Sequence, residues 1–187
     1  MTVTPPVQGP PRAHRRAQSL VLVNTGDGKG KTTSALGTAM RSVSMGWRVC
    51  VIQFMKSGRW KVGEEKSGRD LGMEWWALGD GFTWESTDMG ETQAKALAAW
   101  AAAEEKITSG EYRLVVLDEI TYPVSYGWLD EQRVIDVIRD RPEHVNLILT
   151  GRNASPGLIE AADTVTEMRN EKHAFDRGIK AMKGIDF

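Results

Sequence analysis

The sequence has one cysteine, no long apolar run and almost no net charge, and each shortage excludes a class of protein. Cys50 has no partner within the chain, so an intramolecular disulfide is impossible, and its apolar neighbours indicate a buried core side chain. No apolar run approaches the ~18 residues of a membrane-spanning helix, so no membrane association is expected. Lys plus Arg (24) balance Asp plus Glu (25), which gives no overall attraction to nucleic acid.

Residues typical of zinc sites and of guanine recognition are also missing. The three histidines have no metal-ligand spacing, and with a single cysteine a zinc site is not expected. No Asn or Thr followed by Lys-x-Asp appears, so guanine specificity is unsupported. The sequence therefore gives no reason to expect a guanine nucleotide as the ligand.

Residues 1–18 form an N-terminal segment with its own composition. They contain four of the seven prolines and three arginines but no acidic residue. No apolar stretch of about 7–15 residues follows, as a signal peptide requires, so we expect a cytoplasmic protein. We interpret 1–18 as a flexible basic arm, or alternatively as an arm that orders over an anionic ligand, and 19–187 as a single domain.

From Leu20 onward, short apolar runs alternate with longer helical segments, as in a parallel α/β sheet. Helices are predicted over 35–43, over 88–110 with a capping box at Asp88 and Glu91, over 129–139, and from Ser155 onward. Runs 73–78 and 164–168 are weaker and indicate strands near the sheet edge. Four buried strands are predicted at 20–23, 49–54, 114–117 and 147–149.

A glycine-rich loop stands between the first predicted strand and the first helix. This context is that of a P-loop, in which backbone N–H groups and the helix N-terminus bind phosphate. Lys31 is expected to neutralise phosphate charge and the Thr32 hydroxyl to hold Mg²⁺. The spacing is a variant, because Thr25 stands where a glycine is usual. The predicted ATP-binding residues of the loop are Gly26, Asp27, Gly28, Lys29, Gly30, Lys31, Thr32 and Thr33.

Asp118 and Glu119 follow the buried run 114–117 and resemble the second nucleotide-binding motif. Carboxylates at the C-terminal edge of a parallel sheet lie where ligands bind, and a hard dication prefers oxygen ligands. Asp118 and Glu119 are thus predicted, with Thr32, to bind Mg²⁺. Together the motifs predict a P-loop NTPase-like α/β fold with a mostly parallel, RecA-like sheet flanked by helices.

Several motifs in order resemble the CobA/CobO class of ATP:corrinoid adenosyltransferases, over about residues 20–187. The loop alone names only a superfamily, whereas its conjunction with Gly-Phe-Thr-Trp and the His-Ala-Phe-Asp tail is specific. The matching segments are Gly26–Thr33, Val51–Lys56, Gly81–Glu85, Val116–Tyr122, Lys172–Asp176 and Gly184–Phe187.

The resemblance implies transfer of the 5′-deoxyadenosyl group of ATP to the Co(I) centre of a reduced corrinoid, with release of triphosphate. It implies Lys31, Thr32 and Glu119 as catalytic residues, and Arg41 near the nucleotide. It also implies an electron donor such as a flavoprotein, and a homodimer. Asp27 departs from the asparagine common in the family, and it adds negative charge beside the triphosphate unless its side chain points outward.

Phe82 and Trp84 are the expected corrinoid-binding residues. Two residues apart in a strand, they share a face. Their spacing alone favours ordinary core or surface aromatics, whereas the resemblance places them against the lower side of the corrin.

Two other functions remain open at this point. A RecA-like ATP-hydrolysing switch or motor would use Glu119 to activate water. A corrinoid carrier would bind ATP without turnover. The products separate the three functions, because the transferase releases triphosphate, the hydrolase ADP and phosphate, and the carrier neither.

Overall fold

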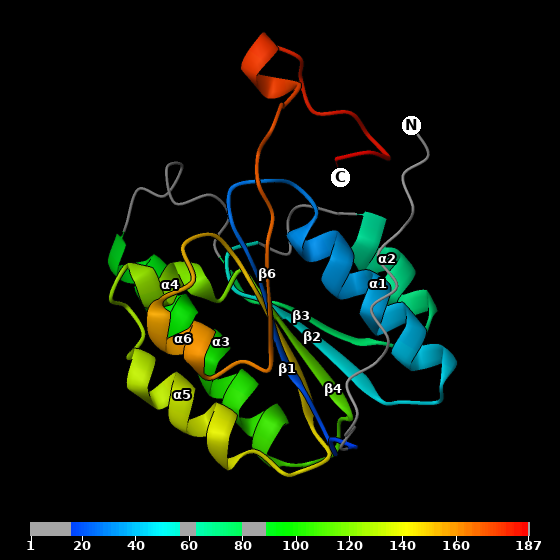
Figure 1. Cartoon of the computed structure of the whole chain (residues 1–187), viewed down its shortest axis with the longest axis vertical. Coiled ribbons are helices and arrows are strands. Elements are labelled where there is room, and N and C mark those ends of the chain that lie inside the picture. The colour runs from blue at the N-terminus through cyan, green and yellow to red at the C-terminus, as the bar shows by residue number, and fades with distance from the viewer. Residues whose placement is uncertain (1–15, 57–62, 80–88, 187) are drawn as a thin grey trace, which may run out of the picture.

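The computed structural model describes residues 16–56, 63–79 and 89–186, and its centre is a sheet of parallel strands (Figure 1). The strand order is β3-β2-β4-β5-β1-β6. The mostly parallel α/β sheet predicted from the sequence is confirmed. The strands are β1 (Val21–Thr25), β2 (Val49–Gln53), β3 (Glu74–Ala77), β4 (Leu114–Asp118), β5 (Asn146–Thr150) and β6 (Thr164–Glu167).

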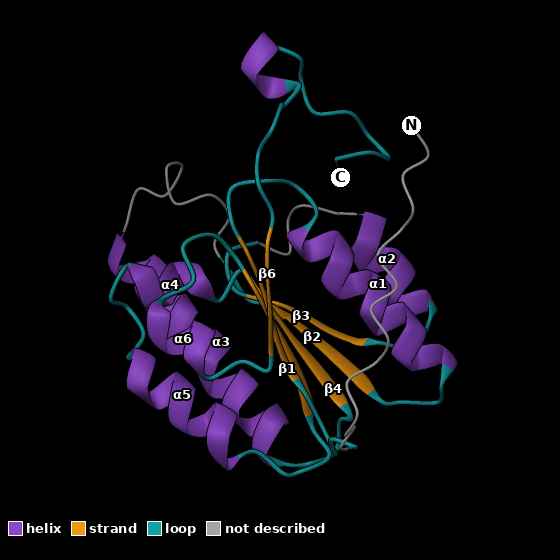
Figure 2. Ribbon diagram, viewed as in Figure 1, coloured by secondary structure: helices purple, strands orange, loops and turns teal. Residues whose placement is uncertain are grey.

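Helices cover both faces of the sheet (Figure 2). α1 and α2 lie on one face, and α3, α4, α5 and α6 lie on the other. The strands β2, β4 and β5 are buried along their whole length, because helices shield both of their faces. The helices are α1 (Lys31–Ser44), α2 (Gly63–Asp70), α3 (Met89–Thr108), α4 (Thr121–Ser125), α5 (Glu131–Asp140) and α6 (Pro156–Glu160), with a 3₁₀ turn at Phe175–Arg177.

The strand order brings three strand ends together around β4. β2 and β5 flank β4, and Gln53 is in register with Asp118. β1 lies beyond β5, and the glycine-rich loop leads from β1 into α1. The loop and the acidic pair therefore both lie at the C-terminal ends of the parallel strands.

Most of the predicted elements are present, and β3 and β6 are the edge strands as expected. α2 was not predicted, because its sequence has no apolar periodicity. Its buried residue is Gly68, where an added Cβ would lie 2.6 Å from the Trp75 ring. α4 is a single short turn that the sequence analysis also missed. The predicted cap at Asp88 and the arm up to residue 15 lie outside the described residues.

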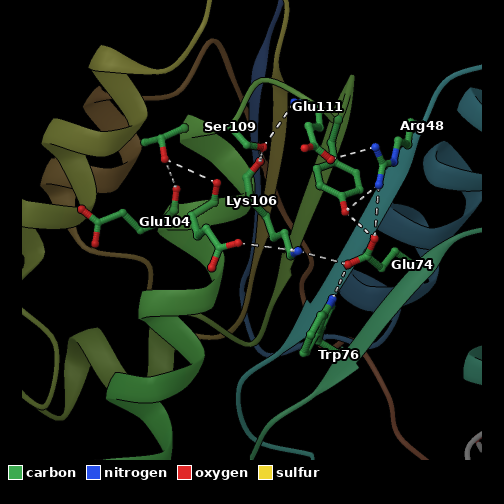
Figure 3. A network of polar contacts seen from close by, with 10 residues as sticks. Arg48, Glu74, Trp76, Glu104, Lys106, Ser109 and Glu111 are labelled. Atoms are coloured by element: carbon green, nitrogen blue, oxygen red, sulfur yellow. Dashed lines mark hydrogen bonds and ion pairs between the residues drawn. The ribbon is translucent and has the colours of Figure 1, made fainter.

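At the N-terminal end of β3, on the side of the sheet away from the loop, a polar network joins β3 to neighbouring segments (Figure 3). The hydroxyl of Tyr112 and the indole of Trp76 both donate to Glu74, and Lys106 from α3 pairs with it at 3.4 Å. The hydrogen bond from Tyr112 lowers the pKa of Glu74 below its ordinary value. This network fastens the edge strand at the end far from the loop.

In the described part of the chain, no helix combines the length and apolarity that crossing a membrane requires.

Candidate nucleotide site

The glycine-rich loop is packed against the segment that follows β6. The N–H of Gly28 donates to the carbonyl of Met168 at 2.7 Å. Gly26 has φ +92°, and a Cβ there would lie 2.5 Å from the same carbonyl oxygen. Thr25, at the variant position, ends β1, and its hydroxyl accepts the N–H of Ala154 at 3.1 Å. Glycine at 26 thus serves both the turn and the close backbone approach.

Lys31 begins α1 and folds back over the loop. Its ammonium donates to the carbonyls of Gly26 and Gly28, at 2.7 Å each. Burial lowers the pKa of Lys31, and the nearby positive charge of Arg152 adds to this shift. A cation therefore lies within the loop, half-buried and held by backbone oxygens.

Asp118 is fully buried, and polar groups surround its carboxylate. Oδ1 accepts from the hydroxyls of Thr32 at 2.8 Å and Thr150 at 2.7 Å. Oδ2 accepts from the amide of Gln53 at 3.0 Å and lies 3.7 Å from the ammonium of Lys56. The structure thus joins the predicted residues Thr32 and Asp118 directly.

Glu119 occupies a strained backbone position beside this carboxylate. Its φ is +67°, in the left-handed region, and its N–H donates to the Thr150 hydroxyl at 2.9 Å. Burial raises the pKa of Glu119 to about 7, with a further contribution from the charge of Asp118. Burial alone would lower the pKa of Lys56, but the carboxylates of Asp118 and Glu119 raise it above its ordinary value.

Two charged side chains of the loop, Lys29 and Asp27, pair with residues outside the loop. Lys29 pairs with Asp186 near the C-terminal end of the described residues. Asp27 is 75% exposed and faces Arg152, with 3.7 Å between Oδ1 and Nε. The extra negative charge at Asp27 therefore lies on the outer surface, beside a compensating cation.

A cavity of about 380 Å³ adjoins the end of the loop, between α1 and α2. Thr33 lies at one end, Trp75 and Met40 line its walls, and Ile185 lines it from the C-terminal segment. Arg41 is exposed in the last turn of α1, roughly 15 Å along the helix from Lys31 at 1.5 Å per residue. Phe82 and Trp84 lie outside the described residues.

Sequence reasoning missed several residues that the structure brings to the site. Gln53 lies in a predicted buried strand, and both Gln53 and Lys56 lie in a segment of the resemblance, without a role for either side chain. Thr150 directly follows a run that the sequence marks only as an apolar strand. Asp186 belongs to the matching C-terminal segment but had no assigned role, and Arg152 carried no signal in the sequence.

The oxygen donors of Thr32, Asp118 and Glu119 fit a hard dication. Mg²⁺ is commonly held by one or two carboxylates together with substrate phosphates. Among residues 16–56, 63–79 and 89–186, no group of three or more His, Cys, Asp or Glu could hold a metal ion by itself.

Comparison with known proteins identifies the family of this chain. Residues 17–187 match the model of ATP:corrinoid adenosyltransferase BtuR/CobO/CobP. A corrinoid adenosyltransferase of Pseudomonas aeruginosa is 45% identical over 175 residues, covering 92% of this chain and 86% of that protein. Corrinoid adenosyltransferase CobA of Salmonella typhimurium is 42% identical over 170 residues, covering 91% and 86%. The chain belongs to the ATP:corrinoid adenosyltransferase family.

Proposed function

We propose that this protein transfers the 5′-deoxyadenosyl group of ATP to the Co(I) centre of a reduced corrinoid, in the synthesis or salvage of adenosylcobalamin. The Co(I) electron pair forms the Co–C bond as the C5′–O bond breaks, and triphosphate leaves with that bond's electrons. The observation that carries this proposal is the family match over residues 17–187, in a chain whose loop and acidic pair share one sheet edge.

The loop supplies the site for the triphosphate. Lys31 holds two backbone oxygens within hydrogen-bonding distance, and phosphate oxygens would take their place when ATP binds. Gly30 has φ +108° where the loop enters α1, and the N–H groups at this helix N-terminus would donate to phosphate oxygens. These groups would bind the leaving group and stabilise its charge as the C5′–O bond breaks.

Mg²⁺ is part of the proposal, with Thr32, Asp118 and Glu119 as its holders. When bound, the ion would neutralise charge on the triphosphate. Lys56 lies beside both carboxylates and limits their mutual repulsion.

The remaining expectations rest on the resemblance. Phe82 and Trp84 would bind the corrinoid, and Arg41 would act near the nucleotide. An electron donor such as a flavoprotein, a homodimer and a cytoplasmic location complete the proposal.

An anaerobic assay with MgATP and chemically reduced cobalamin tests the reaction. We expect a light-sensitive alkylcobalamin with equimolar triphosphate, and we expect Lys31→Ala to abolish both products. Lys66→Ala is the matched control, because Lys66 is exposed on α2 and pairs with Asp70 within its own helix. Accumulation of ADP and phosphate regardless of corrinoid would instead establish the hydrolase, with Glu119 activating water.

A further inference from the structure

A chain of buried hydrogen bonds reaches Asp118 from behind the site. The indole N–H of Trp75 donates to Oε1 of Gln53 at 3.0 Å. Nε2 of Gln53 in turn donates to Oδ2 of Asp118 at 3.0 Å. The three residues are 3%, 1% and 0% exposed, respectively, and come from the adjacent strands β3, β2 and β4.

The chemistry of the indole fixes the direction of this chain. An indole N–H can only donate, so Oε1 of Gln53 must face Trp75 and the NH₂ group must face Asp118. If the amide of Gln53 were rotated by half a turn, its NH₂ group would face the indole N–H of Trp75. Its oxygen would then face the carboxylate of Asp118, and neither contact could be a hydrogen bond. Each orphaned group in this buried site would then cost about 1–3 kcal/mol.

These hydrogen bonds fix the orientation of the Asp118 carboxylate, so that one of its oxygens faces the nucleotide loop. Gln53 and Lys56 hold Oδ2, whereas Thr32 and Thr150 share Oδ1. Of these four groups, Thr32 lies in the first turn of the helix that follows the loop. Thr150 is fully buried on the neighbouring strand. A partial rotation that takes the carboxylate out of its present plane would weaken the contacts on both sides.

We propose that Gln53 and Trp75 are positioning residues, which hold Asp118 so that its Oδ1 stays directed toward Thr32, where the metal bound with ATP would sit. This inference rests on the proposed Mg²⁺ site. We call the hydrogen bonds from Trp75 through Gln53 to Asp118 the relay. The parallel backbone ladders of β2 with β3 and β4 already join these strands, so the relay is not needed to pair them.

The affinity of the protein–ATP complex for Mn²⁺, measured by electron paramagnetic resonance, tests the relay without turnover. We expect Gln53→Met to weaken Mn²⁺ binding about 10- to 100-fold, as loss of an outer partner of a metal ligand does. ATP binding in EDTA should stay within about twofold of wild type, since the loop is intact. Trp75→Phe should weaken Mn²⁺ binding about tenfold, because it frees the amide of Gln53.

A matched control comes from the neighbouring residue of β3. The indole of Trp76 donates to Glu74 in the network at the far edge of the sheet, at 2.8 Å. Trp76→Phe should leave Mn²⁺ affinity unchanged. If Gln53→Met does not fold, as judged by thermal unfolding, Trp75→Phe with its Trp76→Phe control carries the test.

The double variant separates positioning from packing. Trp75→Phe should have no further effect on Mn²⁺ affinity once Gln53 is Met, because the relay is already broken. Additive effects would overturn the relay, and so would wild-type Mn²⁺ affinity in Gln53→Met or Trp75→Phe. Asp118→Asn tests the metal site separately from the relay. If Asp118→Asn loses Mn²⁺ binding while Gln53→Met keeps it, the positioning role is wrong and the metal site stands. If Asp118→Asn also keeps Mn²⁺ binding, the metal site and the positioning role are both wrong.

Discussion

The carboxylate of Asp186 pairs with the ammonium of Lys29 in the nucleotide loop, although the two residues are 157 positions apart in the sequence. Its other oxygen accepts the N–H of Met182 at 2.8 Å and closes a turn there. Ile185, inside that turn, lines the cavity between α1 and α2. The C-terminal segment is therefore attached to the loop, and Figure 1 shows it returning toward α1 after β6.

Replacing Asp186 with Asn should strengthen ATP binding about threefold, because it removes a negative charge near the triphosphate and releases Lys29. The gain should shrink at high salt. Titration calorimetry with ATP at two salt concentrations checks both points. Asp176→Asn, in the exposed 3₁₀ turn, controls for a general change in charge. Weaker ATP binding would show instead that Asp186 holds Lys29 in a binding position.

Asp27→Asn should raise ATP affinity only slightly, less than about threefold, since Arg152 already offsets the charge of Asp27. Arg152→Gln should lower the affinity, because it leaves Asp27 unpaired beside the loop. Both affinities can be measured by the same calorimetry. A fall in affinity on Asp27→Asn would contradict electrostatic interference by this carboxylate.

The sequence predicted those parts of the site that are continuous along the chain. The loop stands between an apolar strand and a helix, and the acidic pair ends a buried strand, so local pattern located both. Gln53 and Thr150 could not be found in this way, because they reach Asp118 only through the order of the strands. Two apolar runs that end in polar residues do not reveal that β4 lies between them.

α2 and the C-terminal attachment were missed for different physical reasons. α2 buries a glycine against Trp75 and not an apolar stripe, so no helical periodicity exists to be recognised. The pair between Lys29 and Asp186 joins residues 157 positions apart, and neither local sequence specifies the other residue as its partner.

The stability of the metal-free protein should depend on Cys50 in alkaline solution. Burial raises the pKa of the Cys50 thiol from 9.0 to about 12, and the charge of Glu74 adds to the shift. Between these values the unfolded chain loses the thiol proton while the folded chain keeps it. Cys50 should therefore lower the free energy of unfolding by about 1.4 kcal/mol for each pH unit above 9.

Urea unfolding of wild type and Cys50→Ala at pH 8, 9 and 10, with reductant present, measures this effect. Cys50→Ala should be less stable at pH 8, because it leaves a small cavity in the core. The gap between the two proteins should narrow from pH 9 to pH 10. A constant gap would mean that the thiol titrates alike in both states.

Two glycines, Gly26 in the loop and Gly37 in the helix that follows it, should respond oppositely to alanine. Gly37 is exposed in the middle of α1, and an added Cβ would meet nothing within 4 Å. Gly37→Ala should therefore raise the free energy of unfolding by about 0.5–1 kcal/mol, because alanine favours the helix. Gly26→Ala should lower it by about 1–3 kcal/mol, since φ is +92° and the Cβ would collide with the Met168 carbonyl.

Chemical unfolding of both variants, together with their ATP affinities, distinguishes strain at the loop from a general effect of alanine. Gly37→Ala should bind ATP as wild type does, whereas Gly26→Ala should bind it more weakly, because relief of the collision moves the loop away from the segment after β6. Equal stability of the two variants would show that the loop can shift from Met168 without cost. The close approach would then have no part in shaping the phosphate site.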